Sequence, residues 1–168
     1  MDMLSVCRQL QHLPHRAIVC WACRCARRVQ PLNPDARLDR AIAAAEVFAS
    51  QATEEDTLLR ARCGVAARRA ASLTVTLPGE DAAGCAAAEA AAAAAHSVTA
   101  RCIPDAAGDA AYAARSAVAA LGLAGQSARS FWQKARADYW RLQKATAGQE
   151  GTTGQPIAPA LFDEGAGP

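Results

Sequence analysis

Alanine makes up about a quarter of the 168 residues of this chain, and this feature restricts the available folds more than any other. Alanine is the strongest helix former, because it loses no side-chain entropy in a helix. Each buried methyl group, however, contributes only about 0.8 kcal/mol of hydrophobic free energy. Helices of this composition form easily but must approach closely, near the short end of the usual axial distance, about 8 Å. We therefore predict an all-α fold, a compact alanine-rich multi-helix bundle.

Prolines, glycines and helix caps divide the sequence into about six or seven helices. Asp35 is expected to cap one of them, and Thr53–Asp56 has the form of a capping box that opens the next. The β-branched stretch 72–77 resembles a strand, but it has no partner run and is interpreted as a helix end. The predicted helices cover about residues 3–12, 15–30, 36–51, 54–77, 80–101, 105–122 and 125–147. Residues 1–147 are expected to form a single helical domain, and 148–168, rich in glycine and proline, a disordered tail.

The formal net charge is +2, which gives no reason to expect a nucleic acid partner. Nucleic-acid binders usually concentrate strong positive charge on one surface. The longest apolar run, 82–95, contains Glu89 and is shorter than the roughly 18–20 residues of a membrane span. We therefore expect neither a nucleic acid nor a membrane as a partner.

The N-terminal part of the chain is basic, because no acidic residue stands between Asp2 and Asp35. The arginines of this interval are Arg8, Arg16, Arg24, Arg27 and Arg28. One interpretation is a transit peptide, which is rich in arginine and poor in acids. We favour the other, a basic helix face that meets an acidic partner helix, because the segment continues into a patterned helix rather than a cleavage site.

The stretch CWACRC, residues 20–25, holds three of the chain's seven cysteines. On a helix, Cys20 and Cys23 share a face, whereas Cys25 points about 160° away. Structural zinc requires four ligands, usually in two close pairs, and the sequence offers no second pair. A redox pair requires a helix N-terminus, and Cys20 lies about four residues into its helix. We therefore favour helix packing over metal or thiol chemistry, and the odd number of cysteines favours reduced thiols in the cytoplasm.

Few residues outside this stretch suggest chemistry. His96 ends a run of alanines, where a hydrogen bond in the core or at its rim is favoured over a partner contact. Trp132, Arg136 and Trp140 recur at every fourth position, so Arg136 could lie between two indole faces. This pattern fits either helix packing or a binding face. The sequence contains no nucleophile elbow, phosphate loop or paired-acid motif, so we predict no enzyme, no catalytic or metal-binding residues and no cofactor.

The segment from Trp21 to Phe48 resembles the opening of the Imm-5-like family of bacterial immunity proteins. The matching positions are Trp21-Ala22, Cys25-Ala26, Arg28, Val29, Pro31-Leu32, Pro34-Asp35, Arg37, Arg40-Ala41-Ile42 and Ala44-Ala45. Stretches 93–100, 105–121 and 131–143 are similar to later helices of the family, so the resemblance covers about residues 17–145.

This resemblance implies an all-helical domain that binds a cognate protein toxin and neutralises it without catalysis. The candidate family-motif or partner-contact positions are Trp21, Cys25, Arg28, Asp35, Arg37, Arg40, His96, Tyr112, Trp132, Arg136 and Trp140. Two alternatives stay open. The chain could be a thiol- or metal-dependent helical protein that uses Cys20 and Cys23, or a helical scaffold or oligomer subunit.

Overall fold

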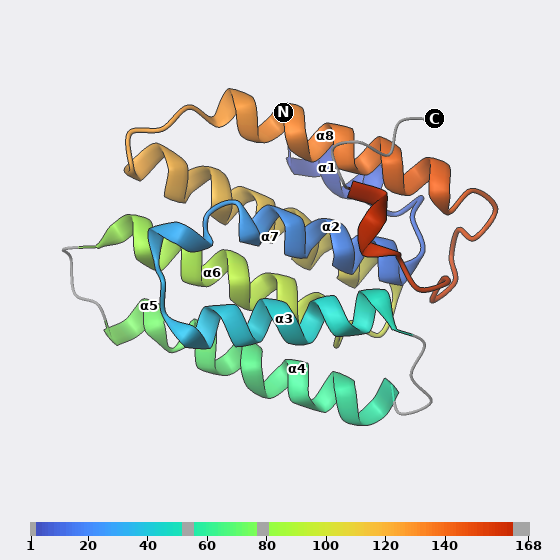
Figure 1. Cartoon of the computed structure of the whole chain (residues 1–168), viewed down its shortest axis with the longest axis horizontal. Coiled ribbons are helices and arrows are strands. Elements are labelled where there is room, and N and C mark those ends of the chain that lie inside the picture. The colour runs from blue at the N-terminus through green and yellow to red at the C-terminus, as the bar shows by residue number, and fades with distance from the viewer. Residues whose placement is uncertain (1–2, 52–55, 77–80, 163–168) are drawn as a thin grey trace.

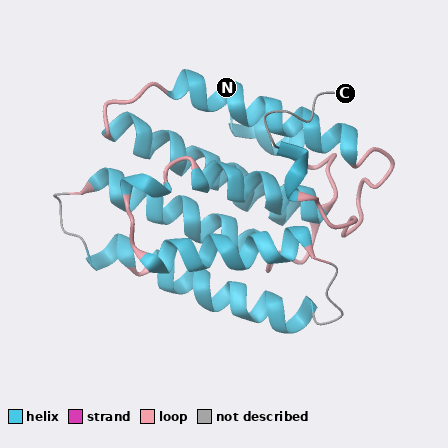
Figure 2. Ribbon diagram, viewed as in Figure 1, coloured by secondary structure: helices cyan, strands magenta, loops and turns pink. Residues whose placement is uncertain are grey.

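The computed structural model describes residues 3–51, 56–76 and 81–162, and all its regular elements in these ranges are helical (Figure 2). The predicted all-α bundle is therefore confirmed. The α-helices are α1 (Met3–Leu10), α2 (His15–Arg27), α3 (Ala36–Ser50), α4 (Asp56–Ala71), α5 (Leu73–Thr76), α6 (Ala82–Ser97), α7 (Ile103–Leu123) and α8 (Ala128–Ala145). Short 3₁₀ helices occupy Gln30–Leu32 and Pro159–Phe162. None of the helices described is long and apolar enough to cross a membrane.

The helices stack from α8 at one edge of the bundle to α4 at the other (Figure 1). Between these edges, α2 packs against α7 and α6, and α3 packs against α2, α6 and α4. Helix α1 lies against α7, beside α8. Helices α3 and α4 lie side by side and run in opposite directions (Figure 1). The outer helix α4 therefore contacts the bundle on one side only.

The centre of the bundle is the alanine-rich pair α6 and α7. Helix α6 buries alanines on almost every side, because it packs against α2, α3, α4 and α7. Helix α7, which packs against α6, also buries small residues, including Ala107, Ala110, Ala114 and Ala117. A helix that is apolar all round belongs in a core. Small side chains on both helices let the backbones approach closely, which compensates for the little free energy that each methyl group contributes.

Aspartate side chains cap the N-termini of two helices. Asp35 caps α3, since its carboxylate accepts a hydrogen bond from the Arg37 amide at 2.7 Å, as predicted. Asp81 caps α6 in the same way, by accepting from the Gly84 amide. The predicted capping box at Thr53–Asp56 lies outside the described residues except for Asp56. Leu73–Thr76 is helical rather than a strand, as predicted, but it forms a separate short helix, α5, instead of the end of α4, which stops at Ala71.

Two predicted boundaries are wrong at the junction of α6 and α7. Helix α6 ends at Ser97 rather than near Arg101, and α7 begins before Pro104 rather than after it. Pro104 occupies the first turn of α7. In the first turn, proline disturbs no helical hydrogen bond, because the amide there has no partner within the helix.

The basic face of α2 meets acids on two neighbouring helices, which confirms the favoured interpretation of the N-terminal arginines. Arg24 donates from Nε to the Asp138 carboxylate of α8 at 2.8 Å, and Arg28 donates to the same oxygen. Arg27 pairs instead with Glu46 of α3, at 2.7 Å. The Asp138 side chain of α8 is only 3% exposed, and Arg24 and Arg28, at the C-terminal end of α2, neutralise its buried charge.

The segment that follows α8 is irregular, as its glycines and prolines predict, yet residues 148–162 pack on the bundle. Carbonyls of Thr152 and Thr153 accept hydrogen bonds from the first two amides of α2, both at 2.9 Å. The Ile157 side chain is buried, and its amide donates to the Ala49 carbonyl at 2.8 Å. These contacts satisfy helix-end groups that would otherwise lack partners. The end of the predicted tail, 163–168, lies outside the described residues.

Replacing the buried carboxylate tests the junction of α2 and α8. Asp138→Asn keeps the shape but leaves Arg24 and Arg28 without their negative partner. We expect the free energy of unfolding to fall by about 3 kcal/mol, because an arginine with no counter-charge is costly in a partly buried site. Asp39→Asn is the matched control, since Asp39 also pairs with an arginine but its side chain is 55% exposed. Denaturant unfolding should show a change below about 1 kcal/mol for that control, and equal losses in both variants would contradict the role of Asp138.

The packing of the C-terminal segment can be tested at Gly154. Its φ is +80°, and an added Cβ would lie 2.6 Å from the Cβ of Pro14. Gly151 has a similar φ of +76° but open space around it. We expect Gly154→Ala, and not Gly151→Ala, to speed hydrogen exchange at the His15 and Arg16 amides. Unchanged exchange in Gly154→Ala would show that the segment does not hold the start of α2.

Candidate functional site

A groove between α3 and α4 combines four arginines with an apolar floor. The lining residues are Arg37, Arg40, Leu58, Ala61, Arg62, Val65, Ala66 and Arg69, and they surround about 400 Å³. We call this site the arginine groove. Its place follows from the helical repeat: Leu58, Ala61, Val65 and Arg69 are three or four residues apart, so they form one stripe along α4. Arg37 and Arg40 are spaced the same way on α3.

The floor of the arginine groove exposes large apolar side chains. Leu58 is 54% exposed and Val65 is 40% exposed, and they lie two turns apart on the same helix. The side of α4 that faces the core is formed by other residues, Cys63, Ala67 and Ala70, which are all buried. Helix α4 therefore has two apolar stripes, and only one of them is covered by the rest of the described chain.

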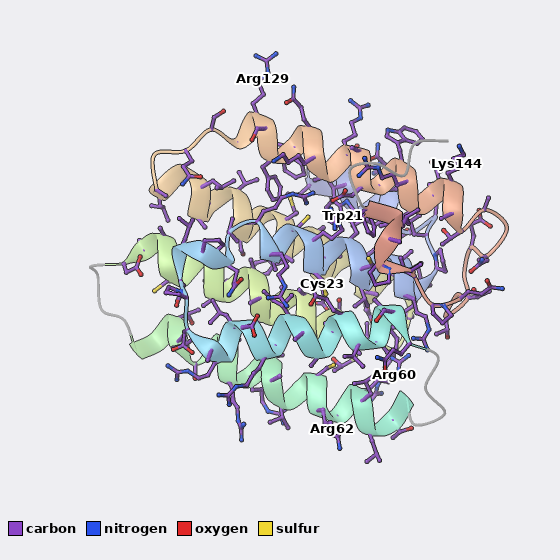
Figure 3. All side chains as sticks on the ribbon, viewed as in Figure 1. Trp21, Cys23, Arg60, Arg62, Arg129 and Lys144 are labelled. Atoms are coloured by element: carbon purple, nitrogen blue, oxygen red, sulfur yellow. The ribbon has the colours of Figure 1, made fainter. Side chains whose placement is uncertain are left out.

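The four arginines of the arginine groove carry positive charge that described acidic side chains mostly do not neutralise. Arg37 pairs with Asp35 at 2.8 Å, and its hydrogen bonds lower the pKa of Asp35 to about 2. The side chains of Arg40, Arg62 and Arg69 make no hydrogen bond or ion pair within the part of the chain that the structure describes. Among the described residues, no acidic one lines the groove. Figure 3 shows Arg62 on the outer side of α4, at the edge of the bundle opposite Arg129.

Three of the candidate positions, Trp21, Cys25 and Arg28, hold α2 against α8 and do not form an exposed contact surface. The Trp21 indole is buried and donates its N–H to the Ala135 carbonyl at 2.8 Å. Cys25 is fully buried, and Arg28 pairs with Asp138. The candidates Asp35, Arg37 and Arg40 lie together at the start of α3, where the two arginines enter the arginine groove.

The candidates His96 and Tyr112 meet in a second hollow, between α4, α6 and α7, which encloses about 410 Å³. His96 lies at the rim, 62% exposed, with Nδ1 at 2.9 Å from the Asp109 carboxylate. The Tyr112 hydroxyl donates to Glu89 at 3.2 Å, and so does the Ser116 hydroxyl. The polar groups of this hollow thus bind one another, which agrees with the favoured interpretation of His96 as a hydrogen-bonded residue at the rim.

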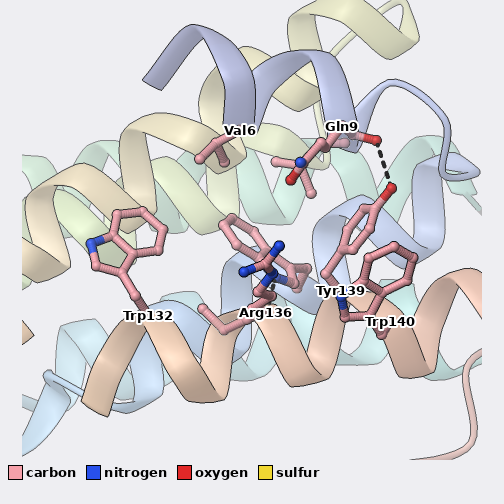
Figure 4. A pocket seen from close by; sticks show the side chains of 9 residues that line it. Val6, Gln9, Trp132, Arg136, Tyr139 and Trp140 are labelled. Atoms are coloured by element: carbon pink, nitrogen blue, oxygen red, sulfur yellow. Dashed lines mark hydrogen bonds between the residues drawn. The ribbon is translucent and has the colours of Figure 1, made fainter. Parts of the chain in front are cut away.

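The aromatic face of α8 contains the remaining candidates, Trp132, Arg136 and Trp140 (Figure 4). The cation–π contacts found in the described chain do not join Arg136 to either indole. Trp132 instead meets Phe131 edge-on, with ring centres 5.3 Å apart, and Trp140 meets Tyr139 at 5.4 Å. The space between this face and α1 is about 20 Å³, enough for about one water molecule. This face therefore serves mainly to seat α1 on the bundle.

The cysteines of the CWACRC stretch are thiols in the helix interior. Cys23 and Cys25 are buried and Cys20 is partly buried. Burial raises the pKa of the Cys20 and Cys25 thiols to about 12, and that of Cys23 well above its ordinary value. Thiolate is the form that attacks or binds a metal, and it is scarce at neutral pH when the pKa is so high. Within the described ranges, no three histidine, cysteine or acidic side chains are placed to share a metal ion.

The chain matches no family model, no curated protein and no solved structure.

Alkylation of the native protein tests the state of the cysteines. At pH 8, iodoacetamide should modify the exposed Cys102 first and leave Cys23 and Cys25 unmodified until the protein is unfolded in urea. A thiol with a pKa near 12 is only about one part in ten thousand thiolate at this pH. Peptide mass spectrometry over time gives the order of reaction. Faster modification of Cys20 or Cys23 than of Cys102 would favour the thiol-dependent alternative.

Proposed function

We propose that this chain is a non-enzymatic binding protein of the bacterial immunity type, which neutralises a cognate toxin by direct contact. The observation that supports it best is the arginine groove: exposed Leu58 and Val65 lie beside Arg40, Arg62 and Arg69, whose side chains have no hydrogen-bond or ion-pair partner in the described chain. A cytoplasmic location fits the reduced thiols.

Arginine beside exposed apolar side chains is typical of a protein interface. Arginine is enriched among residues that dominate binding energy, because its planar guanidinium can bind a carboxylate through two hydrogen bonds. A stable complex buries about 800 Å² on each partner, so the groove would form the centre of a larger contact. The toxin would lose activity because its surface is covered, and this requires no chemical step by the chain.

The resemblance to the Imm-5-like family supports the same surface from the sequence. Arg37 and Arg40 are among the positions that match the family pattern, and both line the arginine groove. The other matching positions include buried residues such as Trp21 and Cys25, which would maintain the fold that presents the groove.

Co-expression with the toxin encoded by the neighbouring gene tests the proposed function. The wild-type chain should restore growth, and Arg62→Glu combined with Arg69→Glu should not, because reversed charge repels the acidic contact. Arg129→Glu is the matched control, an exposed charge reversal at the opposite edge of the bundle (Figure 3). Circular dichroism should show the same helix content for all variants. A purified chain and toxin that do not bind each other would overturn the proposal.

A further inference from the structure

We propose that the arginine groove binds an acidic amphipathic helix of the partner protein, which would lie between α3 and α4 as a third packed helix. This inference depends on the proposed function, because it specifies which part of the partner is recognised. Its evidence is the spacing of the exposed apolar residues, the charge of the four arginines and the small side chains of the floor.

The spacing of the floor matches the repeat of a second helix. Leu58 and Val65 are seven residues apart on α4, which corresponds to about 10.5 Å along the helix axis. A partner helix with apolar residues at positions i, i+3 or i+4, and i+7 presents side chains at the same interval. Ala61 and Ala66 lie in the same floor, and their small side chains allow a helix to approach closely.

The charges define the chemistry of the partner along one side of the apolar stripe. By the helical repeat, Arg62 and Arg69 lie on the side of this stripe that faces α3, so they form one positively charged band with Arg37 and Arg40. Glutamate or aspartate along one side of the partner helix's apolar stripe would therefore meet a row of guanidinium groups. Arg62 and Arg69 are also two turns apart, so the charged and apolar repeats have the same period. A basic or neutral helix would gain the apolar contact only and would meet uncompensated positive charge.

Nucleic acid is a poorer match for the same surface, although phosphate also attracts arginine. A strand would need aromatic side chains for base stacking, and none of the described residues that line the groove is aromatic. It would also leave Leu58 and Val65 in contact with a charged backbone. The exposed apolar floor therefore favours a helix with a hydrophobic stripe over a polyanion.

The test uses a synthetic peptide helix of about 16 residues, with leucines at positions i, i+4 and i+7 and glutamates along one flank of that stripe. Fluorescence anisotropy of the labelled peptide with the full chain should show saturable binding. Replacing all glutamates by lysine should abolish it. In the protein, Arg62→Glu with Arg69→Glu, or Val65→Asp alone, should each weaken binding by about tenfold or more. Arg129→Glu should leave it unchanged, and the double reversal should gain affinity for the lysine peptide.

Other occupants of the groove would give different results. A labelled duplex oligonucleotide that binds tighter than the acidic peptide, with the same loss in Arg62→Glu, would overturn the inference in favour of nucleic acid. Concentration-dependent dimers in sedimentation velocity, abolished by Val65→Asp, would overturn it in favour of a second copy of this chain. No saturable binding of the acidic peptide would also overturn it.

The two proposals fail in distinguishable ways. If the acidic peptide binds in the groove but the neighbouring toxin does not bind the chain, the immunity function is lost and the recognition of an acidic helix remains. If the toxin binds and the groove variants bind it equally well, the toxin contacts another surface and this inference is wrong.

Discussion

Alanine imposes a distance constraint on which the other features of this bundle depend. A methyl side chain fills little volume, so a helix interface made of alanines is dense only when two backbones are close together. The pair α6 and α7 meets this condition along its length. The surrounding helices then supply the large side chains, with Ile18, Trp21 and Phe48 at the contacts of α2 and α3 with their neighbours. The result is a thin alanine centre with bulkier layers outside it.

Polar contacts add specificity that alanine alone cannot provide, because one alanine face packs on another in many registers. The Asp138 carboxylate accepts hydrogen bonds from Arg24 and Arg28, and the Trp21 indole donates to the Ala135 carbonyl. Together these contacts fix how α2 and α8 align. Buried Arg16 has a comparable role at the other end of α2, where it donates to the Gln51 carbonyl at 2.7 Å and lies over the Phe48 ring. Directional groups of this kind select one packing from several of similar hydrophobic energy.

The sequence predicts the features that depend on local chemistry. The all-helical bundle, the cap at Asp35 and the acidic partners of the basic α2 face follow from spacing and composition, although 54–77 forms two helices, α4 and α5, instead of the predicted one. The arginine groove is different. Arg37 and Arg40 could be selected from their sequence pattern, but Leu58, Val65, Arg62 and Arg69 could not, because the sequence does not say which of two apolar stripes on α4 faces the core. Only the packing of α4 on α3 and α6 decides that.

The contacts of the irregular segment after α8 could not be predicted from the sequence for a related reason. Its glycines and prolines predict loops, and the loops are present, but their carbonyls accept hydrogen bonds from the first amides of α2, which lie more than 130 residues away in the chain.

The order of synthesis gives the contact between α2 and α8 a further consequence. Arg24 and Arg28 precede Asp138 by 114 and 110 residues. A ribosome needs roughly 5–20 seconds for that length, and during this time both guanidinium groups must stay hydrated. The packing of α2 therefore cannot be completed until α8, one of the last helices in the chain, has been translated.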